Sequence, residues 1–188
     1  MYEHVFEKIE KRRKTLKINL KFIEFLEKPS SIIKDHLRLA ESKLSQSKKI
    51  VYIGGSLTHV PPDEKIRYEK SAKLVDKLGG FGYAPHIYGT DPIKHLNVSP
   101  QDVRDIDFFW SVLMSDLSIF WCDYPAFGPG IEMAWAEVYN IPSIKIINNK
   151  IKLSRLAKGL RDKSKIIEYD SDKDLFKNLK NKLNKILL

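Results

Sequence analysis

The stretch KIVYIGGS, residues 49–56, decides the fold of this chain. An apolar run that ends in paired glycines is typical of a buried strand followed by a tight turn. Similar runs recur between segments of helical spacing, and this alternation predicts βαβ units around a parallel sheet. We predict strands at 50–53, 83–87, 117–121, 143–147 and 166–169, and helices at 63–78, 101–114, 130–140 and 172–187. The predicted fold class is α/β, with five parallel strands in a doubly wound sheet and helices on both faces.

The first 48 residues lie outside this alternation. Apolar side chains at intervals of three to four residues predict one helix over 3–27, and a second over 32–46 after a break at Lys28-Pro29-Ser30-Ser31. We therefore divide the chain into an N-terminal helical extension, 1–48, and an α/β domain, 49–188. The sequence assigns no role to the extension.

Composition restricts the class of protein. The 188 residues carry a net charge of +9, but the basic residues gather at the two ends and the middle of the chain is mildly acidic. A nucleic-acid module usually concentrates its cations on one binding face, so a nucleic-acid partner is not favoured. No apolar run reaches the length of a membrane span. The single Cys122 favours a cytoplasmic protein, as does an N-terminus in which Glu3, Glu7 and Glu10 leave no unbroken apolar leader.

Histidines follow two of the predicted strands, at His59 and His86, but they lack partners at the spacing of metal ligands. We therefore predict no metal site and no cofactor.

The glycine turn Gly54-Gly55-Ser56 is the first candidate for a binding site. Small residues after a strand let backbone N–H groups approach a phosphate or a sugar. The turn lacks the lysine of a P-loop, and a tight turn without a ligand is the alternative interpretation.

The second candidate is FGPGIE, residues 127–132, a glycine-bounded loop that opens a helix. We expect Glu132 in the first helical turn, where the helix N-terminus would keep it ionised at neutral pH and available as a nucleophile. The alternative is that Glu132 only complements the helix dipole.

The third candidate is a group of acidic residues: Asp102, Asp105 and Asp107 on one predicted helix, and Asp116 before the third strand. Two carboxyl groups in one pocket can divide the work of glycosidic chemistry, one attacking carbon and the other handling a proton. Aspartates are also common at helix N-termini, so only one of these residues need be functional.

Together these motifs resemble the nucleoside 2-deoxyribosyltransferase-like family, most closely its branch of 2'-deoxynucleoside 5'-phosphate N-hydrolases. The resemblance covers about residues 49–185, and Asp116 and Glu132 stand at the family's separation. It rests on YIGGS at 52–56, DFFW at 107–110, PAFGPGIE at 125–132, and LS at 153–154 followed by KG at 158–159.

The resemblance implies a flavodoxin-like sheet in a homodimer that needs no cofactor. It implies that Glu132 attacks the anomeric carbon, that Tyr52 lies near the nucleophile and the sugar, and that Asp107 assists at the base. The residues that it places around the substrate are Gly54, Gly55, Ser56, Gly128, Gly130 and Ser154. Ser56 and Ser154 would hold a 5'-phosphate, with Ser154 reaching in from the neighbouring subunit.

The chain departs from the family pattern at two places. The family's assisting Asp falls on Phe108, so Asp107 fits only with one inserted residue after Trp110, and Asp105 remains the alternative. Ala126 stands where the family has Ser or Asp, and the glycine turn lacks the hydrolases' Arg and has Thr58 nearby, which leaves a phosphate and a plain nucleoside both open.

The predicted function is an N-glycosidase that hydrolyses the base–sugar bond of a (deoxy)nucleoside 5'-monophosphate through a covalent glycosyl-glutamate intermediate. The partner would be a nucleoside or nucleoside monophosphate. One alternative is base exchange by a nucleoside 2-deoxyribosyltransferase. Another is a non-catalytic nucleotide-binding or nucleic-acid-associated protein that uses its basic N-terminus.

Overall fold

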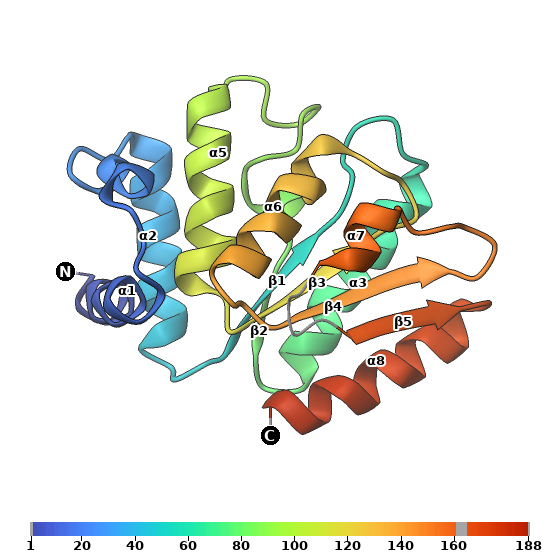
Figure 1. Cartoon of the computed structure of the whole chain (residues 1–188). Coiled ribbons are helices and arrows are strands. Elements are labelled where there is room, and N and C mark those ends of the chain that lie inside the picture. The colour runs from blue at the N-terminus through green and yellow to red at the C-terminus, as the bar shows by residue number, and fades with distance from the viewer. Residues whose placement is uncertain (1, 161–164, 188) are drawn as a thin grey trace.

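The computed structural model describes residues 2–160 and 165–187, and five parallel strands form its centre (Figure 1). They are β1 (Ile50–Gly54), β2 (Phe81–Tyr83), β3 (Leu117–Trp121), β4 (Ser143–Asn148) and β5 (Lys165–Tyr169). The strand order is β2-β1-β3-β4-β5, and every neighbouring pair is parallel. This is the flavodoxin-like order, so the predicted fold class is confirmed.

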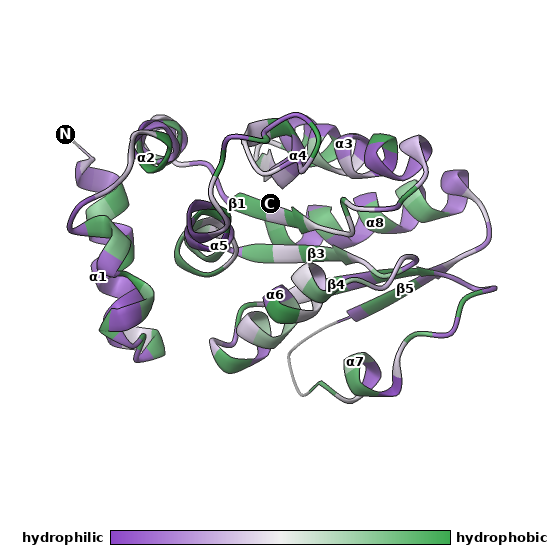
Figure 2. Ribbon diagram, turned by 90° about the horizontal axis from the view of Figure 1, so that it is seen from above, coloured by the Kyte–Doolittle hydropathy of each residue, from purple (hydrophilic) through white to green (hydrophobic). Residues whose placement is uncertain are grey.

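Helices cover both faces of the sheet because alternate residues of each strand point to opposite sides. Ile50 and Tyr52 pack with one layer, and Val51 and Ile53 pack with the other. The first layer contains α1 (Glu3–Leu16), α2 (Ser31–Leu44), α5 (Pro100–Phe108), η3 (Phe109–Met114) and α6 (Phe127–Val138), and the second contains α3 (Pro62–Lys77) and α8 (Asp172–Leu187). Seen from above, the strands lie between α3 and the layer of α5 and α6 (Figure 2).

The prediction of a strand at 83–87 is wrong. β2 lies two residues earlier, and the short helix α4 (Pro85–Tyr88) follows it. Pro85 has no N–H for a sheet ladder but suits the first turn of a helix. Gly82 fits β2 beneath α3, since a Cβ added there would lie 2.5 Å from the Cα of Ala72.

The prediction of one helix over 3–27 is also wrong. α1 ends at Leu16, because Lys17 adopts the left-handed backbone conformation with φ of 52° that commonly ends a helix. Two short 3-10 turns follow, η1 (Leu20–Phe22) and η2 (Glu24–Leu26). They bring the Phe22 ring to 5.1 Å from the ring of Phe108.

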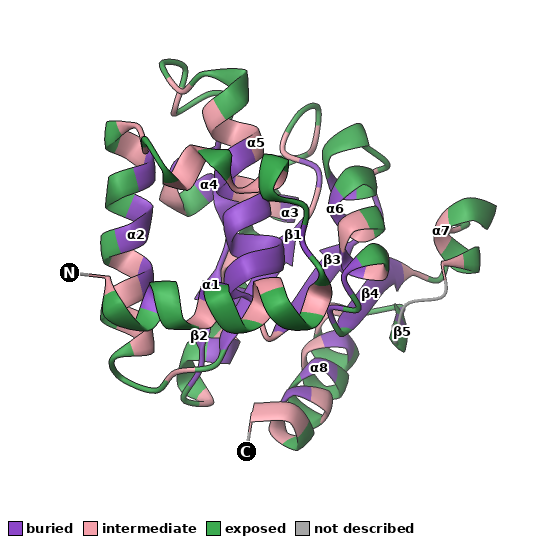
Figure 3. Cartoon of the chain, turned by 60° about the vertical axis from the view of Figure 1, so that its left-hand side comes forward, coloured by how far each residue is buried: buried purple, intermediate pink, exposed green. Residues whose placement is uncertain are grey.

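The predicted helix at 101–114 changes type in its middle. α5 ends at Phe108, and the following η3 is a π-helix. Its six residues are all buried, and they form the turns behind α1 in Figure 3. The Ser115 N–H donates to the carbonyl oxygen of Trp110, five residues earlier, at 3.0 Å. A π turn holds one residue more than an α turn, and it lies in the region where the family resemblance requires an inserted residue.

Asp116 anchors α1 at the end of the sheet where the strands begin, opposite the end that carries the glycine turn. Its carboxylate accepts hydrogen bonds from Lys8 Nζ at 2.9 Å and from the Ile50 N–H at 2.9 Å, and it pairs with Arg12 at 3.3 Å. Val5 on α1 is fully buried in the same core as the strands. Asp116 therefore has a structural role, and the extension packs directly on the sheet.

Candidate active site

A cavity of about 460 Å³ opens where β1 and β3 end. This is the point at which the strand order reverses, and ligands of doubly wound sheets bind there. Its walls come from the glycine turn after β1, the loop at 90–103, α5 and the start of α6. Of the predicted site residues, the cavity is lined by Gly55, Ser56, Asp107, Gly128 and Glu132.

Glu132 faces the first glycine turn from α6. Its side chain is buried, and a Cβ added to Gly54 would lie 2.5 Å from Glu132 Oε2. A Cβ on Gly55 would lie 2.6 Å from the ring of Tyr68. Both glycines are therefore needed, one beneath the carboxyl group and the other beneath an aromatic ring.

Burial determines the protonation of Glu132. Loss of solvent raises its pKa to about 7, and the facing Tyr52 hydroxyl acts in the opposite direction. The expectation that a helix N-terminus keeps Glu132 ionised is wrong, because α6 begins at Phe127 and its first turn holds no acidic residue. Near neutral pH the carboxyl group therefore exchanges readily between its two forms.

Asp107 places a second carboxyl group at the same cavity. Its burial, and then the charge of Glu132, raise its pKa well above the usual range, while the Thr90 hydroxyl lowers it. The two groups titrate as a pair in which Asp107 is the last to lose its proton. Such a pair supplies a proton donor and a carboxylate in one pocket.

Tyr52 on β1 faces Glu132 but does not itself line the cavity. It is fully buried, and burial followed by the charges of Asp107 and Glu132 raises its pKa well above the usual range, so it remains a neutral phenol. Its ring stacks on Tyr83, with centroids 6.0 Å apart. Tyr52 can therefore donate a hydrogen bond to Glu132 without losing its own proton.

Several polar atoms around the cavity are buried without completing a hydrogen bond of normal geometry to any of the described residues. The hydroxyls of Tyr52 and Thr90 face the carboxyl groups of Glu132 and Asp107 and lower their pKa values. The atoms are Tyr52 Oη, Tyr83 Oη, Thr90 Oγ1, Asp107 Oδ1 and Glu132 Oε2. Unsatisfied buried groups are rare in native proteins, and their clustering marks this cavity as a site for a polar ligand.

The other predicted residues occupy different positions. Ser56 is buried at the cavity and donates to the Thr58 carbonyl oxygen at 3.1 Å. Asp105 pairs with Arg104 and accepts from Gln101 at 3.2 Å, away from the cavity.

Gly130 and Ser154 do not line the cavity within one chain. A Cβ on Gly130 would meet nothing within 4 Å, and Ser154 is exposed at the start of α7 (Arg155–Gly159). Their predicted contacts with substrate stay predictions.

One wall of the cavity is formed by a loop that no sequence pattern singled out as part of the site. The Asp91 carboxylate binds Lys65 Nζ at 2.8 Å and the N–H groups of Ile93 and Lys94, and these hydrogen bonds lower its pKa to about 2. The Asp91 N–H in turn donates to His95 Nδ1 at 3.0 Å. An aspartate whose side chain accepts from N–H groups two and three residues later forms a local turn, and the Asp91-Pro92 pair was the available signal.

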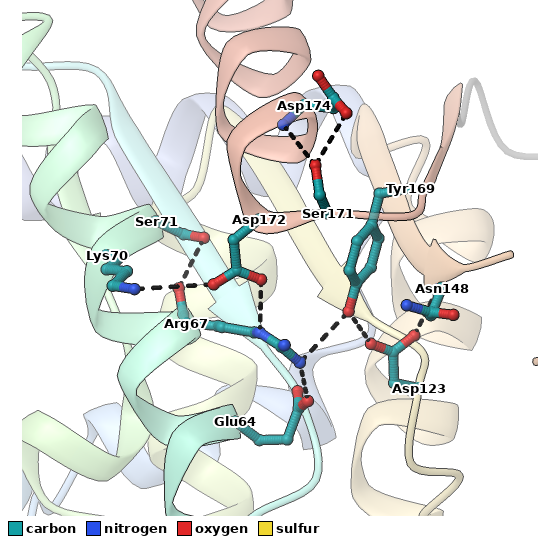
Figure 4. Close-up of polar contacts among 10 residues, drawn as sticks. All are labelled: Glu64, Arg67, Lys70, Ser71, Asp123, Asn148, Tyr169, Ser171, Asp172 and Asp174. Carbon is teal, nitrogen blue, oxygen red and sulfur yellow. Dashed lines mark hydrogen bonds and ion pairs between the residues drawn. The ribbon is translucent and has the colours of Figure 1, made fainter. Parts of the chain in front are cut away.

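A second polar cluster lies on the other face of the sheet (Figure 4). Arg67 on α3 contacts Glu64, Tyr169 and Asp172, and the Tyr169 hydroxyl donates to Asp123. Asp123 also accepts from the Asn148 N–H at 2.6 Å. The cluster joins α3 and α8 to the ends of β3, β4 and β5, so it holds the loop that leads into α6 but does not line the cavity.

Residues 2–160 and 165–187 contain neither a membrane-spanning helix nor a cluster of metal ligands. No helix there has both the length and the apolar character needed to cross a membrane. Within the same residues, no group of three or more His, Cys, Asp or Glu side chains is arranged to hold a metal ion.

The strand order and the cavity define a flavodoxin-like α/β protein with paired carboxyl groups at the reversal point of its sheet. The sequence matches no protein-family model and no curated protein. Among solved structures it is similar to the CMP N-glycosidase BcmB of Clostridium botulinum, with 20% identity and a TM-score of 0.57 over 71% of this chain and 99% of that chain. This likeness supports the fold. A constitutive lysine decarboxylase of E. coli gives a TM-score of only 0.40, at 13% identity over 74% of this chain and 18% of that chain, and supports no argument.

Proposed function

We propose that this protein is an N-glycosidase that hydrolyses the base–sugar bond of a nucleoside 5'-monophosphate through a covalent bond between Glu132 and C1' of the sugar. The observation that carries the proposal is the pair of buried carboxyl groups, Glu132 and Asp107, which face one cavity with unequally raised pKa values. The resemblance of the motifs to nucleotide N-hydrolases, and the fold shared with a CMP N-glycosidase, support the same chemistry.

In the first step the Glu132 carboxylate attacks C1', and the bond between C1' and the base nitrogen breaks. Asp107 donates its proton to the departing base, which takes the bonding electron pair. Tyr52 donates a hydrogen bond to Glu132 and orients it toward C1'. A fixed carboxylate avoids a free oxocarbenium ion, and protonation improves the leaving group.

In the second step water attacks C1' and displaces Glu132. Asp107, now a carboxylate, accepts a proton from that water. The products are the free base and a sugar phosphate, and both carboxyl groups return to their starting forms.

We propose further that the working form is a homodimer formed through α6. The residues Phe127, Ile131, Ala134 and Val138 make an exposed apolar stripe along this helix, with Phe127 93%, Ile131 52% and Val138 68% exposed. A continuous stripe of this kind is typical of a protein–protein interface. No lysine or arginine lines the cavity within the described part of one chain, so Ser154 of a second copy is the candidate for completing the 5'-phosphate site.

The function is tested by incubating the protein with each nucleoside 5'-monophosphate and measuring released base. We expect Glu132→Gln to abolish turnover and Asp107→Asn to lower kcat by about 100- to 10,000-fold, the usual contribution of general acid–base catalysis. Asp105→Asn is the matched control, because Asp105 lies on the same helix two residues before Asp107 but does not line the cavity. Base release by Glu132→Gln at the wild-type rate would eliminate the proposal.

Addition of a second free base separates hydrolysis from exchange, because only exchange yields a new nucleotide.

The dimer is tested by light scattering after gel filtration. Ile131→Glu should convert the dimer to a monomer and raise KM for the monophosphate, while Ile66→Glu, at a site of similar exposure on α3, should leave the dimer intact. A wild-type protein that stays monomeric at micromolar concentrations would contradict this part of the proposal.

A further inference from the structure

The N-terminal segment lies outside the family resemblance, yet its helix α2 contacts the π-helix that follows Asp107 through the buried side chain of His36. α2 runs beside α5 (Figure 1), and His36 is 4% exposed between them and the sheet. The Trp110 Nε1–H donates a hydrogen bond to His36 Nδ1 at 3.0 Å. The contact joins residues 74 positions apart in the chain, one in the extension and one in the π-helix that follows Asp107.

An aromatic column connects this hydrogen bond to the catalytic carboxylate. The Trp110 ring stacks on Tyr83 with centroids 4.2 Å apart and planes at 13°, and Tyr83 stacks on Tyr52 at 6.0 Å and 19°. The His36 ring also meets Tyr83 edge-on at 6.0 Å. All these rings are buried, and a close-packed interior transmits displacements, so a shift of Trp110 moves the Tyr52 hydroxyl relative to Glu132.

The other ring nitrogen of His36 faces the turn at Gly89, which precedes Thr90, a residue that lines the cavity. A Cβ added to Gly89 would lie 3.2 Å from His36 Nε2, and Gly89 has φ of 139°, which favours glycine. Gly89 precedes Thr90, whose hydroxyl faces Asp107. His36 therefore contacts one structure that leads to Glu132 and another that leads to Asp107.

A further hydrogen bond fixes α2 to the helix that carries Asp107. Ser30, the N-cap of α2, donates from Oγ to the Asp102 carboxylate at 2.7 Å, and Asp102 lies in the first turn of α5. The position of α2 is thus tied to α5 by its N-cap Ser30 and to η3 by His36, in its second turn.

The His36 ring is neutral at physiological pH. Burial lowers its pKa to about 4, with Asp35 opposing this effect and His95 adding to it. Because Nδ1 accepts the proton of Trp110, the ring's own proton resides on Nε2, next to Gly89. A neutral imidazole can hold both neighbours at once, whereas an apolar side chain of the same size would leave the indole N–H without a buried acceptor.

We infer that His36 is a positioning residue for the active site, and that the N-terminal segment is part of the catalytic apparatus. His36 holds Trp110 and the Gly89 turn in the positions that set Tyr52 against Glu132 and Thr90 against Asp107. The inference rests on the proposed N-glycosidase function.

The test compares four variants of the full chain: His36→Leu, Trp110→Phe, His36→Asn and the control Leu37→Ala. We expect His36→Leu to lower kcat for base release about tenfold or more with KM nearly unchanged, and to shift the acidic limb of the pH–rate profile. His36→Asn should recover most of the activity, because the amide oxygen replaces Nδ1 as acceptor. Leu37 is equally buried on α2 but has no side-chain atom that can accept a hydrogen bond from Trp110, so Leu37→Ala should lower the Tm and leave the pH profile unchanged.

A lowered Tm with wild-type kcat and pH profile in His36→Leu would overturn the inference and reduce His36 to a structural role. If His36→Leu does not fold, Trp110→Phe removes the same hydrogen bond from the other side and must give the same loss of kcat and shifted profile.

A second measurement is independent of turnover. The carboxyl group of Glu132 is titrated by NMR in the wild type and in His36→Leu without substrate. We expect a shifted midpoint in the variant, and an unchanged midpoint overturns the inference. If the wild type releases no base from any nucleotide, the proposed function fails, but this comparison still decides the role of His36.

Discussion

Replacing Gly54 with alanine tests the geometry of the nucleophile most directly. The added Cβ would lie 2.5 Å from Glu132 Oε2, whereas ordinary contact begins at 3.4 Å, so the carboxyl oxygen must move by 3.4 − 2.5 = 0.9 Å. The added Cβ would also lie 3.0 Å from the Phe120 ring, which is itself tight. Gly54 is not among the glycines with positive φ, so alanine adds a clash without backbone strain. A displacement of about 1 Å lowers a catalysed rate about 100-fold.

We therefore expect Gly54→Ala to lower kcat for base release about 100-fold, measured by separating free base from nucleotide and corrected for the folded fraction by circular dichroism. Gly159→Ala is the control, because a Cβ there meets nothing within 4 Å and Gly159, the last residue of α7, does not line the cavity. It should keep nearly full activity. A folded Gly54→Ala protein with wild-type kcat would refute the placement of the nucleophile above Gly54.

Three further predictions follow from the charges. First, kcat/KM should rise with pH through about 7 as Glu132 ionises, and fall again at alkaline pH as Asp107 loses its proton; a profile flat from pH 6 to 8 contradicts the assignment. Second, the raised pKa means that the folded state binds the Glu132 proton more tightly than the unfolded state, so its contribution to stability is complete below the unfolded value of 4.5 and is lost as pH rises through about 7. Glu132→Gln should therefore raise the free energy of unfolding at pH 8 by roughly 3 kcal/mol and have little effect near pH 4, as urea denaturation would show. Third, Asp116→Ala leaves Lys8 and Arg12 without their shared partner and should lower the free energy of unfolding by about 2 kcal/mol while the folded protein keeps its kcat.

Much of the fold could be predicted because its signals are local. Alternating apolar runs and amphipathic segments identify the β1, β3, β4 and β5 regions and the helices between them. The errors fall where one residue overrides a pattern: Pro85 turns an apolar run into a helix, and Lys17 ends α1 by its left-handed backbone. Nothing in the local pattern predicted the π-helix. The one-residue mismatch between Asp107 and the family motif was the available signal for an irregular turn there.

For the candidate site, the sequence by itself determined that Gly54 and Gly55 stand at the end of the first strand and that Glu132 lies on the helix after the third. Tertiary structure alone decided that Asp107 and not Asp105 faces the cavity, because residues two positions apart on a helix point in different directions. It also decided the protonation of Glu132 and the contact of His36 with Trp110. Exclusion of water and contacts between distant segments exist only once the chain has packed, and no local pattern of residues encodes them.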